Sequence, residues 1–114
     1  MRTGDSSRTK GAFMILVRNV FRLKYGKARE ATALVKEALG IQKRAISGVE
    51  FSTRVLTDVT GPFYTLVLEL TVPNLASFEK YAPQLFADKE WRANYQKMTP
   101  LVESGYREIF TIVE

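Results

Sequence analysis

The stretch Phe63-Tyr64-Thr65-Leu66-Val67-Leu68-Glu69-Leu70-Thr71-Val72 decides the fold of this chain. Side chains alternate between the two faces of an extended strand, so the even-numbered residues share one face. That face is apolar apart from the hydroxyl of Tyr64, and it has to be covered. The opposite face, which carries Phe63, Val67 and Glu69, is half polar. The stretch therefore predicts a sheet with one layer of helices over one side.

Length and composition limit the choice of fold and chemistry. The 114 residues fit one domain. The sequence has neither Cys nor His, which excludes disulfides and thiolate chemistry and removes the commonest general base and the commonest ligand of zinc and haem. We therefore expect no metal site and no cofactor. The net charge of +5 is spread over a surface with both signs interspersed, a pattern that favours solvated surface over nucleic-acid binding.

The start of the chain carries no segment that could enter a membrane. The longest apolar run, Ala12 to Val17, is six residues long and too short to span a bilayer. Small and charged residues precede it, where a secretory signal would need an apolar segment. We expect a cytoplasmic protein with no membrane partner. We also expect residues 1–12 to be a disordered N-terminal extension and residues 13–114 to form a single domain.

Periodicity predicts four strands and two helical regions. Alternating apolar residues predict strands over 13–25, 49–59, 63–72 and 106–113, and spacings of three and four predict a helix over 27–46. A second helical region is expected from Asn74 to Gly105, with a kink or break at Pro83 and a further helical stretch capped by Asp88. Inside the first helix we interpret Gly40 as a point of close packing against a strand.

The order of these elements, β-α-β-β-α-β, predicts the topology. With right-handed crossovers it gives an α+β, ferredoxin-like fold, in which a four-stranded antiparallel sheet has its helices on one face. The uncovered face would still hold apolar side chains such as Val20, Leu56 and Val67. A patch of that kind is unusual for a monomer, and a second copy packed face to face about a two-fold axis would bury it. We therefore expect a homodimer through the sheet face.

Two motifs add a resemblance to a known group of proteins over roughly Met14 to Val113. Ser77-Phe78-Glu79-Lys80-Tyr81 opens the second helical region, Asp88-Lys89-Glu90-Trp91 lies late in it, and the last strand ends in Phe110-Thr111-Ile112-Val113. With these motifs and this element order the chain resembles the dimeric α+β barrel superfamily, and within it NIPSNAP-like and antibiotic biosynthesis monooxygenase-like proteins. The resemblance implies a dimeric α+β barrel with a small pocket between the sheet and its helices.

The resemblance also implies candidate site residues. Some oxygenase relatives use an Asn on the first strand with a Trp and a Tyr from the second helical region, which correspond here to Asn19, Trp91 and Tyr95. An amide can hold dioxygen or an enolate, and the aromatic rings can stack an electron-rich ring. The alternative is structural: Asn19 bonds to backbone or the sheet edge, and the two aromatics are core residues. Haem-degrading relatives bind iron through a His, which this sequence lacks, and this argues against haem turnover.

Charged residues on the strands form a second candidate group. Arg54, Glu69 and Arg107 are expected to make an ion-pair cluster on the mixed side of the sheet, either as a structural contact at the dimer interface or with Glu69 as a general base. The candidate catalytic residues are Asn19, Trp91 and Glu69. The candidate ligand-pocket residues are Tyr64, Tyr95 and Arg54.

Three classes of function remain open at this stage. The first is a protein that binds a small apolar or aromatic molecule, with cofactor-independent monooxygenase-like activity. The second is a non-catalytic dimeric binding or assembly protein. The third, an RNA-binding module, is disfavoured because the aromatic run over 61–68 lacks the basic, Gly-rich pattern of such sheets, and we expect no nucleic-acid partner.

Overall fold

The computed structural model describes residues 13–114, and the expected extension over residues 1–12 lies outside this range. The elements follow one another as β2 (Ile15–Leu23), α1 (Ala28–Ala45), β3 (Ser52–Thr57), β4 (Thr65–Val72), α2 (Leu75–Ala87), α3 (Lys89–Met98), a 3₁₀ helix η1 (Thr99–Leu101) and β5 (Val102–Thr111). The predicted order of strands and helical regions is confirmed. The second helical region consists of three pieces.

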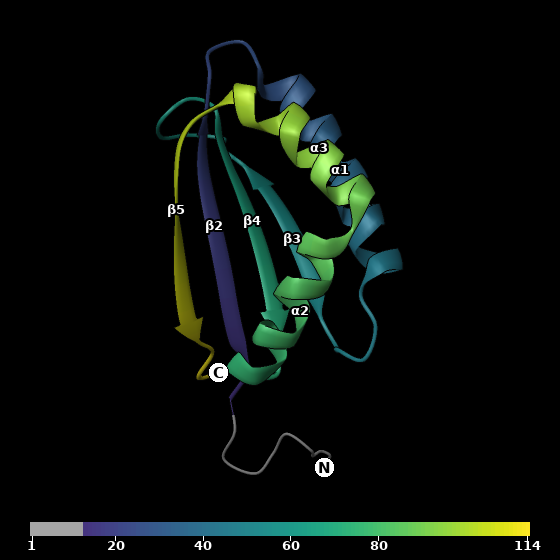
Figure 1. Ribbon diagram of the computed structural model, residues 1–114. Helices are drawn as coiled ribbons and strands as arrows, with labels where there is room; N and C mark the ends of the chain where they lie inside the picture. The colour runs from purple at the N-terminus through teal and green to yellow at the C-terminus, as the bar shows by residue number, and fades with distance from the viewer. Residues whose placement is uncertain (1–12) are drawn as a thin grey trace.

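The four strands form one antiparallel sheet in the order β3-β4-β2-β5. The three α-helices all lie on one side of this sheet, as Figure 1 shows, so the α+β ferredoxin-like fold is confirmed. The face that carries the helices is called the helix face below, and the opposite face is called the bare face. Within residues 13–114, no helix combines the length and apolar character needed to cross a bilayer.

The core lies between the helix face and the helices. Val17, Leu66 and Val72 are the large side chains with less than 2% of their surface exposed, and all three point from β2 and β4 toward the helices. One buried cluster joins Val17 and Val72 to Tyr81 and Leu85 of α2. A second joins Leu66 to side chains of α1. The even-numbered residues of β4 are therefore the ones that pack in these two clusters, as its alternation predicts, while Val67 and Glu69 on the other face are buried by their neighbours in the sheet.

The helix boundaries confirm two predicted caps and correct one predicted break. The side chain of Asn74 accepts a hydrogen bond from Ser77 N at 2.8 Å and begins α2, and Asp88 caps α3 in the same way. Pro83 lies inside α2, which continues without interruption to Ala87. The predicted break at this residue is wrong, and the helix ends instead before Asp88. Pro83 and Glu79, the residue whose carbonyl it cannot bond, are both exposed.

Two glycines have roles that differ from those expected. Gly105 does not end a helix: it lies within β5 opposite Phe21, where an added Cβ would be 2.9 Å from the Phe21 ring. Strand β5 consequently begins at Val102 rather than at residue 106. Gly40 is exposed, and no atom lies within 4 Å of the position of an added Cβ. The interpretation that Gly40 packs against a strand is therefore wrong.

Candidate functional site

Asn19 and Arg107 form a polar pair on the helix face. They are neighbours in the register between β2 and β5, and Arg107 Nε donates to Asn19 Oδ1 at 2.7 Å. For this amide we expected either contact with a ligand or a bond to backbone or the sheet edge, and its partner is a charged side chain of the edge strand. This bond uses the acceptor of the amide, and none of the hydrogen bonds within residues 13–114 uses its Nδ2 donors.

Arg107 also lies against an aromatic ring of α2. Its guanidinium carbon is 5.5 Å from the centre of the Phe78 ring, a distance at which a cation and a ring face attract. Phe78 stacks in turn on Tyr81, with ring centres 6.3 Å apart. Tyr81 is buried, and burial raises the pKa of its hydroxyl well above the ordinary value. Tyr81 is therefore a neutral packing residue that holds Phe78 beneath the guanidinium.

Trp91 and Tyr95 stack on one another along α3. Their ring centres are 5.2 Å apart with 22° between the planes, and Phe86 meets Trp91 at 5.3 Å. Trp91 is partly buried against the same core cluster as Phe78. Tyr95 is 57% exposed, so it is not a core residue. Trp91 is therefore partly a core residue, as the structural alternative expected for both aromatic side chains, and Tyr95 is not.

Asp88 fixes the start of α3 and so the position of Trp91. Its Oδ1 accepts from Trp91 N at 2.9 Å, and its two carboxylate oxygens lie 3.3 Å from the guanidinium of Arg44. The bond from the Trp91 backbone and the contact with Arg44 both hold the pKa of the Asp88 carboxyl below its usual value. Arg44 also bonds to Glu90 at 2.7 Å, which ties α1 to α3.

Glu69 lies on the other side of the sheet from Asn19. In the register of β2 and β4, Asn19 pairs with Leu68, and Arg18 pairs with Glu69 on the bare face. The structure therefore separates the three candidate catalytic residues: Asn19 and Trp91 belong to the helix face, and Glu69 belongs to the bare face. Within one chain, the sheet lies between Glu69 and any ligand that touches Asn19.

The ion-pair cluster around Glu69 has a different membership from the one expected. Arg54 donates to Glu69 Oε1 from Nε at 2.9 Å and from Nη2 at 2.6 Å. Arg107 takes no part, because it faces the helices. Arg18 and Glu108, which the sequence pattern did not predict, continue the cluster across β2 and β5. Arg18 Nε lies 3.7 Å from Glu69 Oε2, and Arg18 Nη1 lies 3.6 Å from Glu108 Oε1. Their places on alternating strands were visible in the sequence, but the register that aligns them was not.

Tyr64 does not join the Asn19 pair either. It has a positive φ of 62° at the end of the loop between β3 and β4, and its ring meets Tyr25 edge-on at 5.0 Å. It lines a hollow of about 650 Å³ between this loop and the start of α1, together with Phe63, Asp58 and residues of that helix. As a ligand-pocket candidate, Tyr64 therefore belongs to a hollow of its own.

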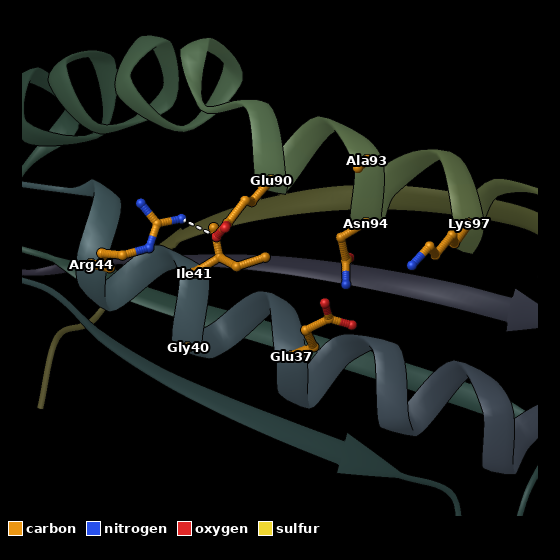
Figure 2. A pocket seen from close by; sticks show the side chains of 8 residues that line it. All are labelled: Glu37, Gly40, Ile41, Arg44, Glu90, Ala93, Asn94 and Lys97. Carbon is orange, nitrogen blue, oxygen red and sulfur yellow. Dashed lines mark hydrogen bonds and ion pairs between the residues drawn. The ribbon is translucent and has the colours of Figure 1, made fainter.

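A second hollow, of about 390 Å³, lies between α1 and α3. Figure 2 shows Gly40 and Ile41 on the α1 side, Ala93 and Asn94 on the α3 side, and the Arg44–Glu90 ion pair at one end. Asn94 is buried, and its Nδ2 donates to Leu34 O at 2.9 Å, a bond that joins the two helices. Neither hollow is lined by Asn19, Trp91 or Arg107.

Within residues 13–114, no group of three or more Asp or Glu side chains lies close enough together to hold a metal ion. The polar groups that meet on the helix face are the Asn19 amide and the Arg107 guanidinium. The guanidinium binds anions and carbonyl oxygens, and the amide oxygen already accepts from Arg107.

The fold has clear relatives among solved structures. A NIPSNAP family protein of unknown function from Agrobacterium tumefaciens is 20% identical and matches with a TM-score of 0.77, covering 90% of this chain and 91% of its own. An uncharacterized NIPSNAP domain protein from Burkholderia xenovorans is 17% identical with a TM-score of 0.75, covering 87% of this chain and 94% of its own. SnoaB, a cofactor-independent oxygenase from Streptomyces nogalater, is 14% identical with a TM-score of 0.68, covering 90% and 96%.

No protein-family model matches the sequence, and no curated protein matches it. At these identities the structural matches show the fold alone, and they confirm the resemblance on which the sequence analysis relied. The chain has the fold shared by NIPSNAP family proteins and by SnoaB.

Proposed function

We propose that the chain binds a small aromatic molecule that carries an oxyanion or a carbonyl oxygen, on the helix face beside Asn19 and Arg107. The observation that carries this proposal is the 2.7 Å bond between these two residues, with the guanidinium carbon of Arg107 lying 5.5 Å from the centre of the Phe78 ring of α2. A guanidinium and an amide are suited to an oxygen atom that carries negative charge. Half-exposed rings such as Phe86 and Tyr95 offer stacking surface to an aromatic ring.

A cofactor-independent oxygenation is the reaction that this arrangement would serve. In such a step a phenol and dioxygen give a quinone and water, so the substrate itself supplies the electrons. Arg107 would stabilise the phenolate, whose ionisation makes the ring electron-rich, and the Nδ2 group of Asn19 would donate to the developing oxyanion. SnoaB, which shares the fold, is a cofactor-independent oxygenase. The second candidate is a non-catalytic binding or assembly protein that uses the same surface without turnover.

The fluorescence of Trp91 provides a direct binding assay, because it is the one tryptophan of the sequence. We expect 3-hydroxy-2-naphthoate to quench this fluorescence in a saturable way. Arg107→Ala should weaken binding by about tenfold, since it removes one hydrogen bond to a charged group. Arg54→Ala on the bare face is the matched control and should bind normally. Equal affinity of Arg107→Ala and the wild type would overturn the proposed site.

Oxygen uptake separates the enzyme from the binder. The wild-type protein is incubated with 1,8-dihydroxynaphthalene in an oxygen-electrode cell, and the rate is compared with that of Asn19→Ala. Uptake that falls in Asn19→Ala supports the oxygenase. Saturable binding of the naphthoate without any protein-dependent uptake supports the non-catalytic alternative.

We also propose that the chain forms a homodimer through the bare face. Tyr106 and Phe110 on this face are 60% and 46% exposed, and Leu16 and Leu56 lie partly exposed beside them. Burial of such a surface between two copies stabilises association in proportion to the apolar area removed from water. Light scattering at micromolar concentration should give twice the 12.9 kDa of one chain. A mass of one chain under these conditions would contradict the dimer.

A further inference from the structure

One charged residue from each strand lies in a line across the bare face. In sheet order these residues are Arg54, Glu69, Arg18 and Glu108, and this line is called the ionic row below. The strand register places each of them directly beside the next. The charges therefore alternate in sign from one edge of the sheet to the other.

The ionic row lies between one largely apolar row and one row that is half apolar. On one side the same register aligns Leu56, Val67, Val20 and Tyr106. On the other side it aligns Ser52, Thr71, Leu16 and Phe110. A partner that covers these two rows must also cover the charges between them. Charges buried in this way contribute less to affinity than to the choice of partner and orientation.

The centre of the ionic row is incompletely bonded within one chain. Arg18 Nε lies 3.7 Å from Glu69 Oε2, and Arg18 Nη1 lies 3.6 Å from Glu108 Oε1. Both distances exceed the range of a hydrogen bond. Arg18 Nε is shielded from water and has no hydrogen-bond acceptor within residues 13–114. Glu69, only 9% exposed, is bonded by Arg54 through one of its two oxygens. The Arg18 side chain is 37% exposed, so the exposed part of its guanidinium has donors to offer a carboxylate from outside.

A two-fold axis can place a second copy on this face in two simple ways. An axis that runs parallel to the strands, between β4 and β2, reverses the row, so Arg54 faces the second copy's Glu108 and Glu69 faces its Arg18. An axis that runs along the row places every residue opposite itself, with like charges facing. The alternating row of four is complementary to its own reversed copy and repels its unreversed copy. Twisted sheets pack at about 30° to one another, so the facing pairs at the ends of the row move apart, and Glu69 and Arg18 at its centre face each other most directly.

From this complementarity we propose that the ionic row orients the second copy, with the two-fold axis parallel to the strands, and makes the chain selective for its own copies. The inference rests on the homodimer proposed above. It assigns to Arg18 and Glu69 a role in recognition between chains, in addition to the contacts that they make within one sheet.

A row-reversed variant tests this orientation. It combines Arg54→Glu, Glu69→Arg, Arg18→Glu and Glu108→Arg, so that neighbouring charges within its own sheet remain opposite. Wild-type and row-reversed chains with different mass tags are mixed, allowed to exchange subunits, and counted by native mass spectrometry. We expect both chains to form homodimers and the mixed dimer to fall from the statistical half to about a tenth or less, because every facing pair in it is alike in charge.

Each other outcome has a definite meaning. A statistical mixture of dimers overturns the inference and leaves the homodimer in place. An excess of mixed dimers also overturns it, since that result requires the axis that runs along the row. A wild-type chain at the mass of a monomer overturns the homodimer itself, and the inference with it.

Two single variants keep the proposal testable if the row-reversed chain does not fold, as judged by circular dichroism. Glu69→Arg alone and Arg18→Glu alone each place like charges at the centre of a homodimer, whereas their mixture restores opposite charges there. We expect each variant alone to dissociate at concentrations where the wild type is dimeric, and their equimolar mixture to regain the dimer mass. A mixture that associates no better than either variant alone overturns the proposal.

Discussion

The two faces of the sheet are built from the same strands and differ in almost every other respect. Neighbouring residues of β2 illustrate this: Arg18 points to the bare face between Glu69 and Glu108, and Asn19 points to the helix face and bonds to Arg107. The helix face is apolar around one polar pair and is covered by three helices. The bare face carries the ionic row between an apolar row and a mixed row, and no helix within residues 13–114 covers it.

This difference separates the residues that stabilise the fold from those that we assign to association. Burial of apolar side chains is the main favourable term in folding, and the two clusters of buried apolar side chains lie between the helix face and the helices. Exposed ion pairs contribute little to the stability of one chain. Substitutions on the helix face should therefore change the free energy of unfolding, and substitutions on the bare face should change the association of chains.

The largest expected effect comes from the centre of the helix face. Leu66 is fully buried, so Leu66→Ala should lower the free energy of unfolding by about 3 kcal/mol, the sum of lost burial and a cavity. Urea unfolding followed by circular dichroism measures this change. Leu56→Ala removes the same atoms from the bare face, where Leu56 is only partly buried. At concentrations where the chain is monomeric it should cost about 1 kcal/mol or less, and equal costs at the two positions would contradict the contrast between the faces.

A smaller effect on stability is expected at Gly105, the glycine on the helix face of β5. Gly105 leaves space for the ring of Phe21, with Val20 O at 3.2 Å from the position of an added Cβ. Gly105→Ala should displace the ring and destabilise the chain by about 1 to 2 kcal/mol. Gly40→Ala is the matched control in open space on α1, and it should stabilise the chain by up to about 1 kcal/mol. Thermal unfolding of both variants in parallel gives the sign of each change.

Much of this fold follows from local patterns in the sequence. The alternation of the stretch that ends at Val72 gives the covered face of β4, and Asn74 and Asp88 mark the starts of α2 and α3 because their side chains accept backbone hydrogen bonds. Pro83 and Gly40 misled the prediction for one shared reason. Pro83 suggested a break in its helix, and Gly40 suggested a close contact with a strand. Both residues lie on exposed surfaces of continuous helices, where the chain has neither a break nor such a contact.

The candidate site was predictable only in part, because its geometry depends on the register between distant strands. Asn19 stood out as one amide in an apolar row, but its partner Arg107 is 88 residues away and was assigned to the wrong face. The alignment of Arg107 with Asn19 depends on the register between β2 and β5. The sequence pattern placed the start of the last strand at residue 106 instead of Val102, and it contained no information about this register. The same missing register hid Arg18 and Glu108 from the predicted ion-pair cluster.

The smallest expected effect comes from the ion pairs of the helix layer, which provide a contrast to the ionic row. The pKa of Asp88 is lowered below its ordinary value of 3.8 by the bond from Trp91 N and by Arg44. A lowered pKa in the folded chain means that the contribution of Asp88 is fully present above pH 3.8 and is lost as the pH falls through the folded value. The chain should therefore lose stability in acid partly through this carboxyl.

Asp88→Asn isolates that contribution, because an amide oxygen can still cap α3 but does not titrate. Urea unfolding at about pH 6 should find the variant less stable than the wild type, and the difference should shrink at pH values well below the ordinary pKa of a carboxyl. Since Arg44 is largely exposed, the difference should also shrink in high salt, where surface charges are screened. A difference that is constant with pH would assign the role of Asp88 to helix capping geometry alone. In that case the charge of the Asp88–Arg44 pair would add nothing to stability, in contrast to the ionic row, whose proposed role depends on charge.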